Sequence, residues 1–501
     1  MKVAGVRWGL GLGAGLGLYI LTSCAVPLPE EDPAGSNGGE TPEVHIKPTI
    51  KLQPIPEGVR WARESSHLLA WKVPDLPKNI EILAKITASF DGGATWQQVE
   101  NVSAYPDNRY VWVVPASGPP KVRFRVAISD SQVETKDVEF EPSTRRKYRW
   151  TKILNEAPWG GRDGVGGLVY NDRMWVLGGW NPLVNRLEST NDVWSSVDGV
   201  KWSLEKPNTF GTPAFDGKRD WEGRHWFGTH VHDGQMWIVG GDSRQGYYQT
   251  DVWSSTDGKN WTRKDIYKTE THPIYVPSSR EVSDNFGFRY LVITGTFNGK
   301  LWAMGGETNA TFVDPLWPGI KSAVFNDVWS SKDGANWTKV QTRGPIWEPR
   351  GMISESPAFK GRMWVVGGGT YDDVVSGRPH RNYYADTWST ADGAEWRKEP
   401  EIAPFSTRSY HSTAVFDERL WVIAGADIDG NLADAWYTSD GRNWYEAVPP
   451  TDFAGRHAHN VWAYKGALYV GLGNEFDEDP KRGANEPPKW LSDIWRIDVV
   501  P

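Results

Sequence analysis

The sequence predicts an all-β protein, and three observations support this prediction. One phrase recurs along the chain, typified by NDVWSSKDGANWTKV at residues 326–340. A short apolar run ending in glycine precedes each copy, and an Asp-Gly pair interrupts each full copy. Each full phrase therefore predicts a β-hairpin, because an Asp-Gly tip tolerates the positive φ angles of tight hairpin turns.

The copies have a spacing that indicates an array of structural units rather than separate domains. Five full copies begin at Asn191, Thr250, Asn326, Ala385 and Ala433, and a shortened sixth, SDIWRIDVV, begins at Ser492. Together with the upstream apolar run and one further run, each copy supplies four strands. Four-stranded sheets repeated at this spacing are typical of β-propeller blades, so residues 146–501 are predicted to form six blades.

The upstream runs carry a resemblance to a known family. They read RMWVLGG, QMWIVGG, KLWAMGG, RMWVVGG, RLWVIAG and ALYVGLG. The order of strand, Gly-Gly, loop, strand and Trp is similar to the Kelch repeat, the unit of galactose-oxidase-like propellers. The resemblance covers residues 146–501 and implies a six-bladed Kelch-like β-propeller.

The ends of this region predict how such a ring is closed. No Trp-led strand follows the sixth unit, whereas YRWTKIL at residues 148–154 precedes the first unit and resembles NWTKV. A circular array leaves no open sheet edge only if this strand completes the last blade. We therefore expect the segment around Trp150 to pair with the segment around Trp495.

The N-terminus predicts a membrane anchor. Residues 1–23 combine a charged start, a short apolar stretch and the small residues that precede Cys24, which resembles a bacterial lipoprotein signal peptide with lipidation at Cys24. Residue 25 is Ala rather than the Asp of inner-membrane retention, which favours the outer membrane. Residues 24–44 are rich in Pro, Gly and Glu and are predicted to be a disordered linker.

Residues 45–145 are predicted to form a separate β-sandwich. Alternating runs such as KVRFRVAISD are separated by turn signals, and they resemble the Ig-like or fibronectin-like modules of bacterial surface proteins. SFDGGATW at residues 89–96 matches an Asp-box turn, to which we assign no chemistry.

Composition excludes several functions. The net charge of -8 shows no basic surplus, so no nucleic-acid partner is expected. Cys24 is the single cysteine, which excludes a disulfide framework, a thiolate metal site and the cysteine-tyrosine crosslink of galactose oxidase. The turns of the repeated phrase are one residue shorter than the sialidase Asp box, so they indicate a structural turn rather than a sialidase. No cofactor and no metal are expected.

An aromatic-x-x-Arg spacing occurs once in every unit, before its first strand. The arginines are Arg162, Arg224, Arg289, Arg350, Arg408 and Arg456. By resemblance to Kelch propellers they lie near the mouth of the central channel, where six guanidinium groups would favour an anionic partner. In the alternative interpretation each arginine fixes its own loop through backbone carbonyls.

Long and dissimilar loops between the second and third strands predict the binding face. Their candidate ligand-binding residues are Trp180, Tyr247, Tyr248, Tyr371, His380 and Tyr384. Aromatic and polar side chains of this kind suit a glycan or a protein partner. The alternative function is an enzyme that acts on an acidic sugar in the channel, similar to a Kelch-type sialic-acid mutarotase, with Glu355, His411 and His459 as weak catalytic candidates.

Overall fold

The computed structural model describes residues 47–75, 82–103, 108–183, 188–243, 248–264, 286–287, 289–309, 322–373, 377–399, 402–475 and 489–501. The described residues all belong to one compact unit, residues 46–501. The predicted signal peptide, the lipidation site Cys24, the linker and Tyr247 all lie outside the described residues.

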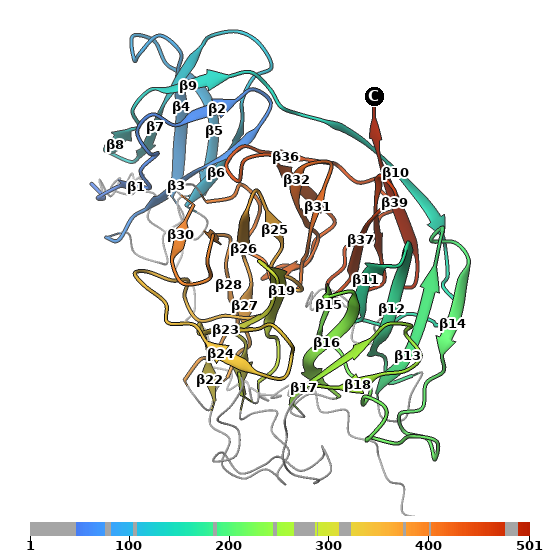
Figure 1. The fold of residues 1–501 in the computed structure, drawn as a ribbon. Coiled ribbons are helices and arrows are strands. Elements are labelled where there is room, and N and C mark those ends of the chain that lie inside the picture. The colour runs from blue at the N-terminus through green and yellow to red at the C-terminus, as the bar shows by residue number, and fades with distance from the viewer. Residues whose placement is uncertain are drawn as a thin grey trace, which may run out of the picture. The chain divides into compact units, whose positions relative to one another are not determined.

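The described residues form β-strands and no helix, which confirms the all-β prediction (Figure 1). Within this part of the chain, no helix is therefore long and apolar enough to span a membrane.

The first nine strands form two groups around one hydrophobic core. Their bounds are β1 (Lys51–Leu52), β2 (Arg60–Ala62), β3 (Ser66–Lys72), β4 (Leu83–Ser89), β5 (Gln97–Ser103), β6 (Arg109–Val113), β7 (Lys121–Ile128), β8 (Ser131–Glu134) and β9 (Val138–Glu141). One sheet has the order β2-β9-β7-β4-β5, with β8 on β7, and the other group joins β1 and β6 to β3. Side chains from both groups, including Trp61, Trp71 and Phe124, pack in one buried cluster.

Six antiparallel units of four strands, here called repeat sheets 1 to 6, follow along the chain. Five of them are separate four-stranded sheets, and repeat sheet 5 is part of a seven-stranded sheet that also contains β1, β3 and β6. Repeat sheet 1 contains β11 (Gly166–Tyr170), β12 (Arg173–Trp180), β13 (Ser189–Ser196) and β14 (Trp202–Lys206). Repeat sheet 2 contains β15 (Gly228–His232), β16 (Gln235–Asp242), β17 (Tyr248–Ser255) and β18 (Thr262–Arg263). Repeat sheet 3 contains β19 (Ile293–Phe297), β20 (Lys300–Met304), β23 (Val328–Ser331) and β24 (Trp337–Lys339).

The other three sheets follow the same plan. Repeat sheet 4 contains β25 (Ala358–Phe359), β26 (Arg362–Val366), β29 (Thr387–Thr390) and β30 (Trp396–Lys398). Repeat sheet 5 contains β31 (Ser412–Phe416), β32 (Arg419–Ile423), β35 (Ala435–Thr438) and β36 (Trp444–Glu446), and its last strand also bridges to β3. Repeat sheet 6 contains β37 (Asn460–Tyr464), β38 (Ala467–Gly471), β39 (Ile494–Val500) and β10 (Lys147–Leu154).

Three two-stranded ladders extend the loops between second and third strands. They are β21 (Glu307–Thr308) with β22 (Ala323–Val324), β27 (Gly369–Thr370) with β28 (Asn382–Tyr383), and β33 (Ala426–Asp427) with β34 (Gly430–Asn431).

Repeat sheet 6 joins the two ends of the repeat region. Strand β10 pairs antiparallel with β39, so that Trp150 lies opposite Ile497 and Lys152 lies opposite Trp495. This is the pairing that the sequence predicts between the segments around Trp150 and Trp495.

A buried hydrophobic cluster fills the space between each pair of consecutive sheets, including sheets 6 and 1. Strand β12 shows how one strand serves two clusters. Trp175 and Leu177 pack toward repeat sheet 2, whereas Met174 and Val176 pack toward repeat sheet 6. Alternate residues point to opposite faces of a strand, so burial of both faces requires a continuous apolar run. That requirement explains sequences such as MWVL.

Four of the five Asp-Gly turns fit against a tryptophan of the preceding sheet. Gly258 has a φ of 74°. A Cβ atom at Gly258 would overlap the ring of Trp175, and one at Gly334 would overlap the ring of Trp237. Glycine is thus required twice, by the positive φ angle and by the close approach of a neighbouring ring.

Candidate functional site

The six repeated arginines are buried in ion pairs within their own sheets. The pairs are Arg162–Asp192, Arg224–Asp251, Arg289–Asp327, Arg350–Asp386, Arg408–Asp434 and Arg456–Asp493, with closest N–O distances between 2.5 and 2.8 Å. Each aspartate is the Asp of the repeated phrase. Each also accepts a hydrogen bond from the indole N–H of the Trp two residues later.

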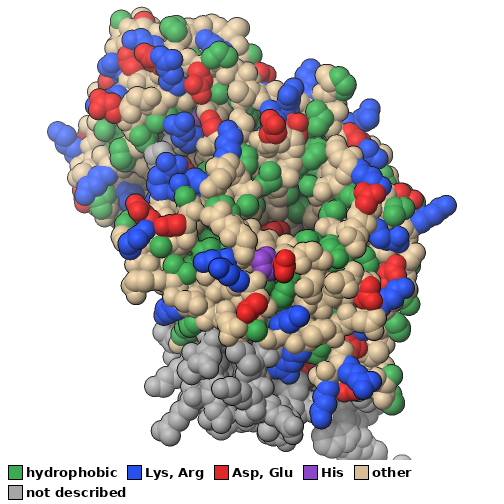
Figure 2. Space-filling model, viewed as in Figure 1, with side chains coloured by type: hydrophobic (Ala, Val, Ile, Leu, Met, Phe, Trp, Pro, Cys, Tyr) green, Lys and Arg blue, Asp and Glu red, His purple; other side chains and the backbone are tan. Residues whose placement is uncertain are grey.

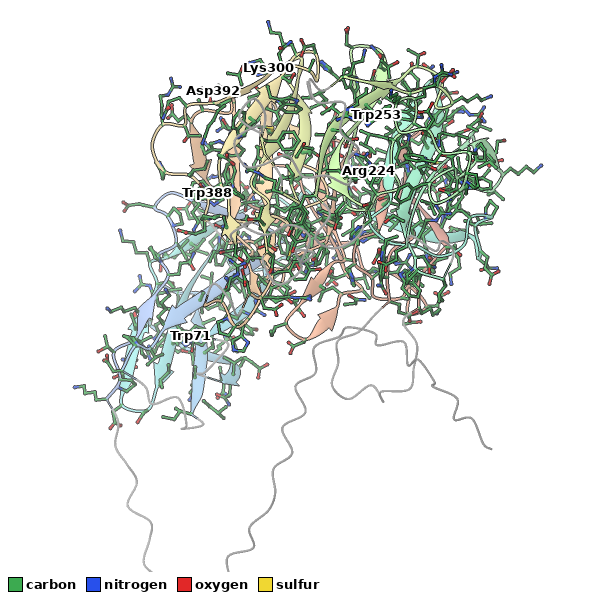
Figure 3. All side chains as sticks on the ribbon, turned by 90° about the horizontal axis from the view of Figure 1, so that it is seen from below. Trp71, Arg224, Trp253, Lys300, Trp388 and Asp392 are labelled. Carbon is green, nitrogen blue, oxygen red and sulfur yellow. The ribbon has the colours of Figure 1, made fainter. Side chains whose placement is uncertain are left out.

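Arg224 shows the complete pattern of contacts. In Figure 3 the Arg224 side chain lies among the repeat sheets, whereas Lys300 and Asp392 lie at the periphery. Its guanidinium donates to both carboxylate oxygens of Asp251 and to the carbonyl of Gly240. Burial acts to raise the pKa of Asp251, but the charge and hydrogen bonds of Arg224 outweigh burial and hold the pKa below its usual range. This geometry agrees with the alternative interpretation, in which each arginine fixes its own loop, because the positive charge of each arginine is neutralised inside the fold.

The residue two positions after each arginine has a left-handed backbone conformation. Gly164, Trp226, Leu291, Met352, Tyr410 and Ala458 have φ angles between 49° and 61°. Backbone hydrogen bonds join several of them across neighbouring sheets: Trp226 N donates to Gly164 O, Gly164 N to Ala458 O, Ala458 N to Tyr410 O, and Tyr410 N to Met352 O. We call these six residues the central ring. Left-handed non-glycine residues cost about 1–3 kcal/mol each, so the surrounding structure must hold them in place.

The central ring forms the floor of a cavity of about 260 Å³, here called the loop cavity. Trp226, Leu291, Tyr410 and Ala458 of the ring line it. The residues directly after four of the arginines also line it, namely Asp163, His225, Tyr290 and His457. Loops between second and third strands supply the walls, with Trp180, Glu188, Tyr371, Arg381, Tyr383, Asp427, Ile428, Asn431 and Asn474.

Aromatic rings make up a continuous part of the wall. The rings of Tyr290 and Tyr371 stack with centroids 5.8 Å apart, and Tyr248 stacks on Tyr290 at 5.0 Å from behind the wall. Tyr371 then meets Tyr410 at 6.2 Å, and Tyr410 contacts Trp226 edge to face at 4.9 Å. Such a wall offers flat apolar surface, and burial raises the pKa of Tyr290 and of Tyr410 well above the usual value. Both phenols are therefore neutral at physiological pH.

A charged imidazole lies at the edge of this wall. His225 Nδ1 is 2.8 Å from Asp242 Oδ1, and the ring of Trp180 is 6.2 Å away. Burial acts to lower the pKa of His225, but the carboxylates of Asp242 and Asp163 outweigh it and raise the pKa to about 9. Burial raises the pKa of Asp163 to about 6. At neutral pH the site therefore holds an imidazolium between two carboxylates.

The opposite side of the loop cavity is polar but less charged. His457 Nδ1 lies 2.7 Å from Asn431 Oδ1, and burial lowers the pKa of His457 to about 4. A neutral imidazole that donates from Nδ1 presents Nε2 as an acceptor. Arg381 stacks on Tyr371 at 4.6 Å and pairs with Asp372. The lining thus offers both hydrogen-bond donors and acceptors, without a surplus of positive charge.

The loop candidates predicted from sequence are placed differently from one another. Trp180 and Tyr371 line the loop cavity. Tyr248 is buried one layer behind, stacked on Tyr290 and hydrogen bonded through its hydroxyl to Asn309. The Tyr384 ring lies 3.6 Å from the guanidinium carbon of Arg350. His380 is exposed and is not among the residues that line this cavity.

Two of the three catalytic candidates share a cavity, and the third does not line it. Glu355 and His459 line a separate cavity of about 50 Å³ below the central ring, and His411 is not among its lining residues. Burial lowers the pKa of His411 to about 3 and that of His459 well below the usual value, so both imidazoles are neutral. Neither has the pKa near 7 that suits a general base.

Sequence reasoning missed His225, Trp226, Tyr290, Tyr410 and His457. Their signal was present in the repeat itself. The two positions after each arginine vary among the copies, although the arginine and the later strand do not. Because the frame repeats, the two residues after each arginine occupy equivalent places in the six repeat sheets. Their side chains differ, so together they can provide a site with varied chemistry.

Comparison with known proteins adds no assignment: no protein-family model matches the chain, and the search of curated proteins found no match.

Proposed function

We propose that residues 45–145 form an Ig-like or fibronectin-like β-sandwich and that residues 146–501 form a six-bladed Kelch-like β-propeller. Two features support the propeller. Hydrophobic clusters join consecutive repeat sheets all the way from sheet 1 to sheet 6 and from sheet 6 back to sheet 1. Strand β10 also completes repeat sheet 6 from the start of the region.

We further propose that Cys24 carries a lipid anchor and that the protein faces the periplasm or cell surface at the outer membrane. This part of the proposal rests on the sequence of residues 1–25. A lipid anchor holds a protein at a membrane without spanning it.

The function that the geometry supports best is glycan binding in the loop cavity. One observation carries it: a cavity of about 260 Å³ whose lining combines Trp180, Trp226, Tyr371, Tyr383 and Tyr410 with histidine, carboxyl and amide groups. Aromatic faces stack on the apolar face of a sugar ring, and the polar groups bind its hydroxyls. The volume lies just below the usual range of small-ligand pockets, which begins at about 300 Å³. It therefore suits a single sugar residue.

The same lining favours an uncharged sugar over an acidic one. The six repeated arginines are neutralised by aspartates of their own sheets. The cavity itself contains Asp163, Glu188 and Asp427 against the cations His225 and Arg381. An acidic sugar would add negative charge to a lining in which carboxyl groups already outnumber cations.

Replacing Trp180 with Ala is expected to weaken sugar binding about tenfold or more, because the indole provides stacking surface at the cavity wall. Isothermal titration of the purified chain with galactose, glucose, mannose and N-acetylglucosamine, alongside glucuronate, measures this. Leu183→Ala is the matched control, since Leu183 belongs to the same loop, is 80% exposed and does not line the cavity. Binding of no neutral sugar, or equal affinity in Trp180→Ala, would remove the proposal.

A further inference from the structure

A second space lies on the other side of the central ring, between the first strands of the repeat sheets. A cavity of about 50 Å³ lies directly below the ring, and a cavity of about 200 Å³ lies next to it. Both are lined by Gly167, Thr229, Glu355, Thr413 and Val461, so they are adjacent, and together they are here called the inner channel. Trp226 and Ala458 line both the 50 Å³ cavity and the loop cavity and thus separate them.

The charge in the inner channel is carried by one group. Among the described residues that line it, Glu355 is the charged side chain, and the lining includes no Lys, Arg or Asp. Desolvation beside the channel raises the pKa of Glu355 to about 7, although 45% of its side-chain surface is exposed. The titratable neighbours are His230, whose Nδ1 is 3.8 Å from Glu355 Oε1, and His459. Burial lowers the pKa of both imidazoles far enough to leave them neutral at pH 7.

Several polar atoms around this carboxylate have no hydrogen-bond partner within the described chain. They are both ring nitrogens of His230, both ring nitrogens of His459, and Nδ2 of Asn460. All three side chains are at least nine-tenths buried, and each lines one of the two cavities of the channel. Buried polar atoms without partners are costly, so their occurrence around one cavity indicates a ligand that satisfies them.

The chemistry of these groups defines the ligand. The carboxylate of Glu355 and the one acceptor nitrogen of each neutral imidazole attract a positively charged hydrogen-bond donor, whereas Asn460 Nδ2 and the other ring nitrogens are donors themselves. The hydroxyls of Thr229 and Thr413 are already hydrogen bonded, to Gly167 and to the carbonyl of Glu355. An ammonium group supplies one positive charge and at least three N–H donors. A divalent metal usually takes several carboxylate or imidazole ligands, and no group of three or more His, Cys, Asp or Glu suited to a metal occurs in the described residues.

We propose that the inner channel binds the ammonium group of a small amine, with Glu355 as its counter-charge. The 200 Å³ cavity leaves room for a short carbon chain beyond the nitrogen. This site is separate from the loop cavity and does not depend on glycan binding there.

Titration calorimetry of the full chain at pH 8 with ammonium chloride, methylamine and n-butylamine tests the proposal. We expect one binding site and a loss of affinity of about tenfold or more in Glu355→Gln. Affinity should also fall between pH 8 and pH 5.5, because protonation of Glu355 removes its charge. If only ammonium binds, the natural ligand is the free ammonium ion. If the alkylamines bind with equal or higher affinity, the natural ligand is the amino group of a larger molecule.

Glu418→Gln is the matched control, because Glu418 is an exposed carboxylate at the turn between β31 and β32. Thermal unfolding checks that Glu355→Gln is folded, and Glu355→Asp, which keeps the charge, should retain binding if the Gln variant does not fold. No binding by the parent chain, unchanged affinity in Glu355→Gln, or equal binding of n-butanol or K⁺ would overturn the proposal.

Discussion

The double variant Arg224→Gln, Arg408→Gln is expected to lose most of its folded, soluble protein. Each substitution removes the guanidinium that neutralises an aspartate, the buried Asp251 or the partly buried Asp434. Removing one partner of a buried ion pair costs about 3–5 kcal/mol. Two such losses in separate sheets approach the total stability of a typical folded domain, about 5–15 kcal/mol.

Soluble yield and urea denaturation of the single and double variants measure this effect. Arg343→Gln is the control, because Arg343 also pairs with an aspartate, Asp392, but its side chain is 65% exposed. An exposed pair contributes about 1 kcal/mol or less, so this control should unfold at nearly the parent urea concentration. A double variant as stable as the control would show that the arginines are not part of the scaffold and would reopen their role in binding an anion.

Replacing Trp495 with Ala is expected to lower the free energy of unfolding by about 3–5 kcal/mol, as for other buried large-to-small changes. Trp495 is 2% exposed and packs in the cluster between repeat sheets 5 and 6. Its ring contacts Phe453 at 5.6 Å and lies 4.6 Å from Lys152 Nζ on strand β10. The loss should therefore loosen β10 before other strands.

Amide hydrogen exchange, followed by mass spectrometry, is the matching measurement. In Trp495→Ala the peptide containing residues 147–154 should exchange faster than peptides from repeat sheets 2 and 3. Trp495→Phe keeps a ring but loses the hydrogen bond to Asp493, so its effect should be smaller. Uniform destabilisation of all sheets, or none, would contradict the assignment of this residue to the junction of the two ends.

The sequence predicted the strands well because the determinants are local. The Asp-Gly turn, the apolar runs and the aromatic-x-x-Arg spacing are all visible within a few residues. The β10–β39 pairing was also predictable, because YRWTKIL fills a place that the sixth copy lacks.

The candidate site was less predictable because it depends on contacts between distant residues. The partner of Arg224 lies 27 residues away on another strand, so the sequence left its role open. Tyr290, Tyr371 and Tyr410 come from different loops and meet only in the folded chain. Trp180 and Tyr371 were found because loop length alone indicated the face. His225 lies one position and Tyr410 two positions after an arginine, outside the long loops, so loop length did not indicate them.

The most direct test of the proposed closure of the propeller is an engineered disulfide between β10 and β39. Thr151 lies opposite Arg496. Residues paired in this way have Cα atoms about 4.5–5.5 Å apart, which a disulfide accommodates. In a Cys24→Ser background, Thr151→Cys with Arg496→Cys should oxidise within one molecule, whereas the offset pair Thr151→Cys with Asp498→Cys should do so poorly. Failure of the first pair to cross-link, or cross-links only between molecules, would show that β10 does not complete repeat sheet 6.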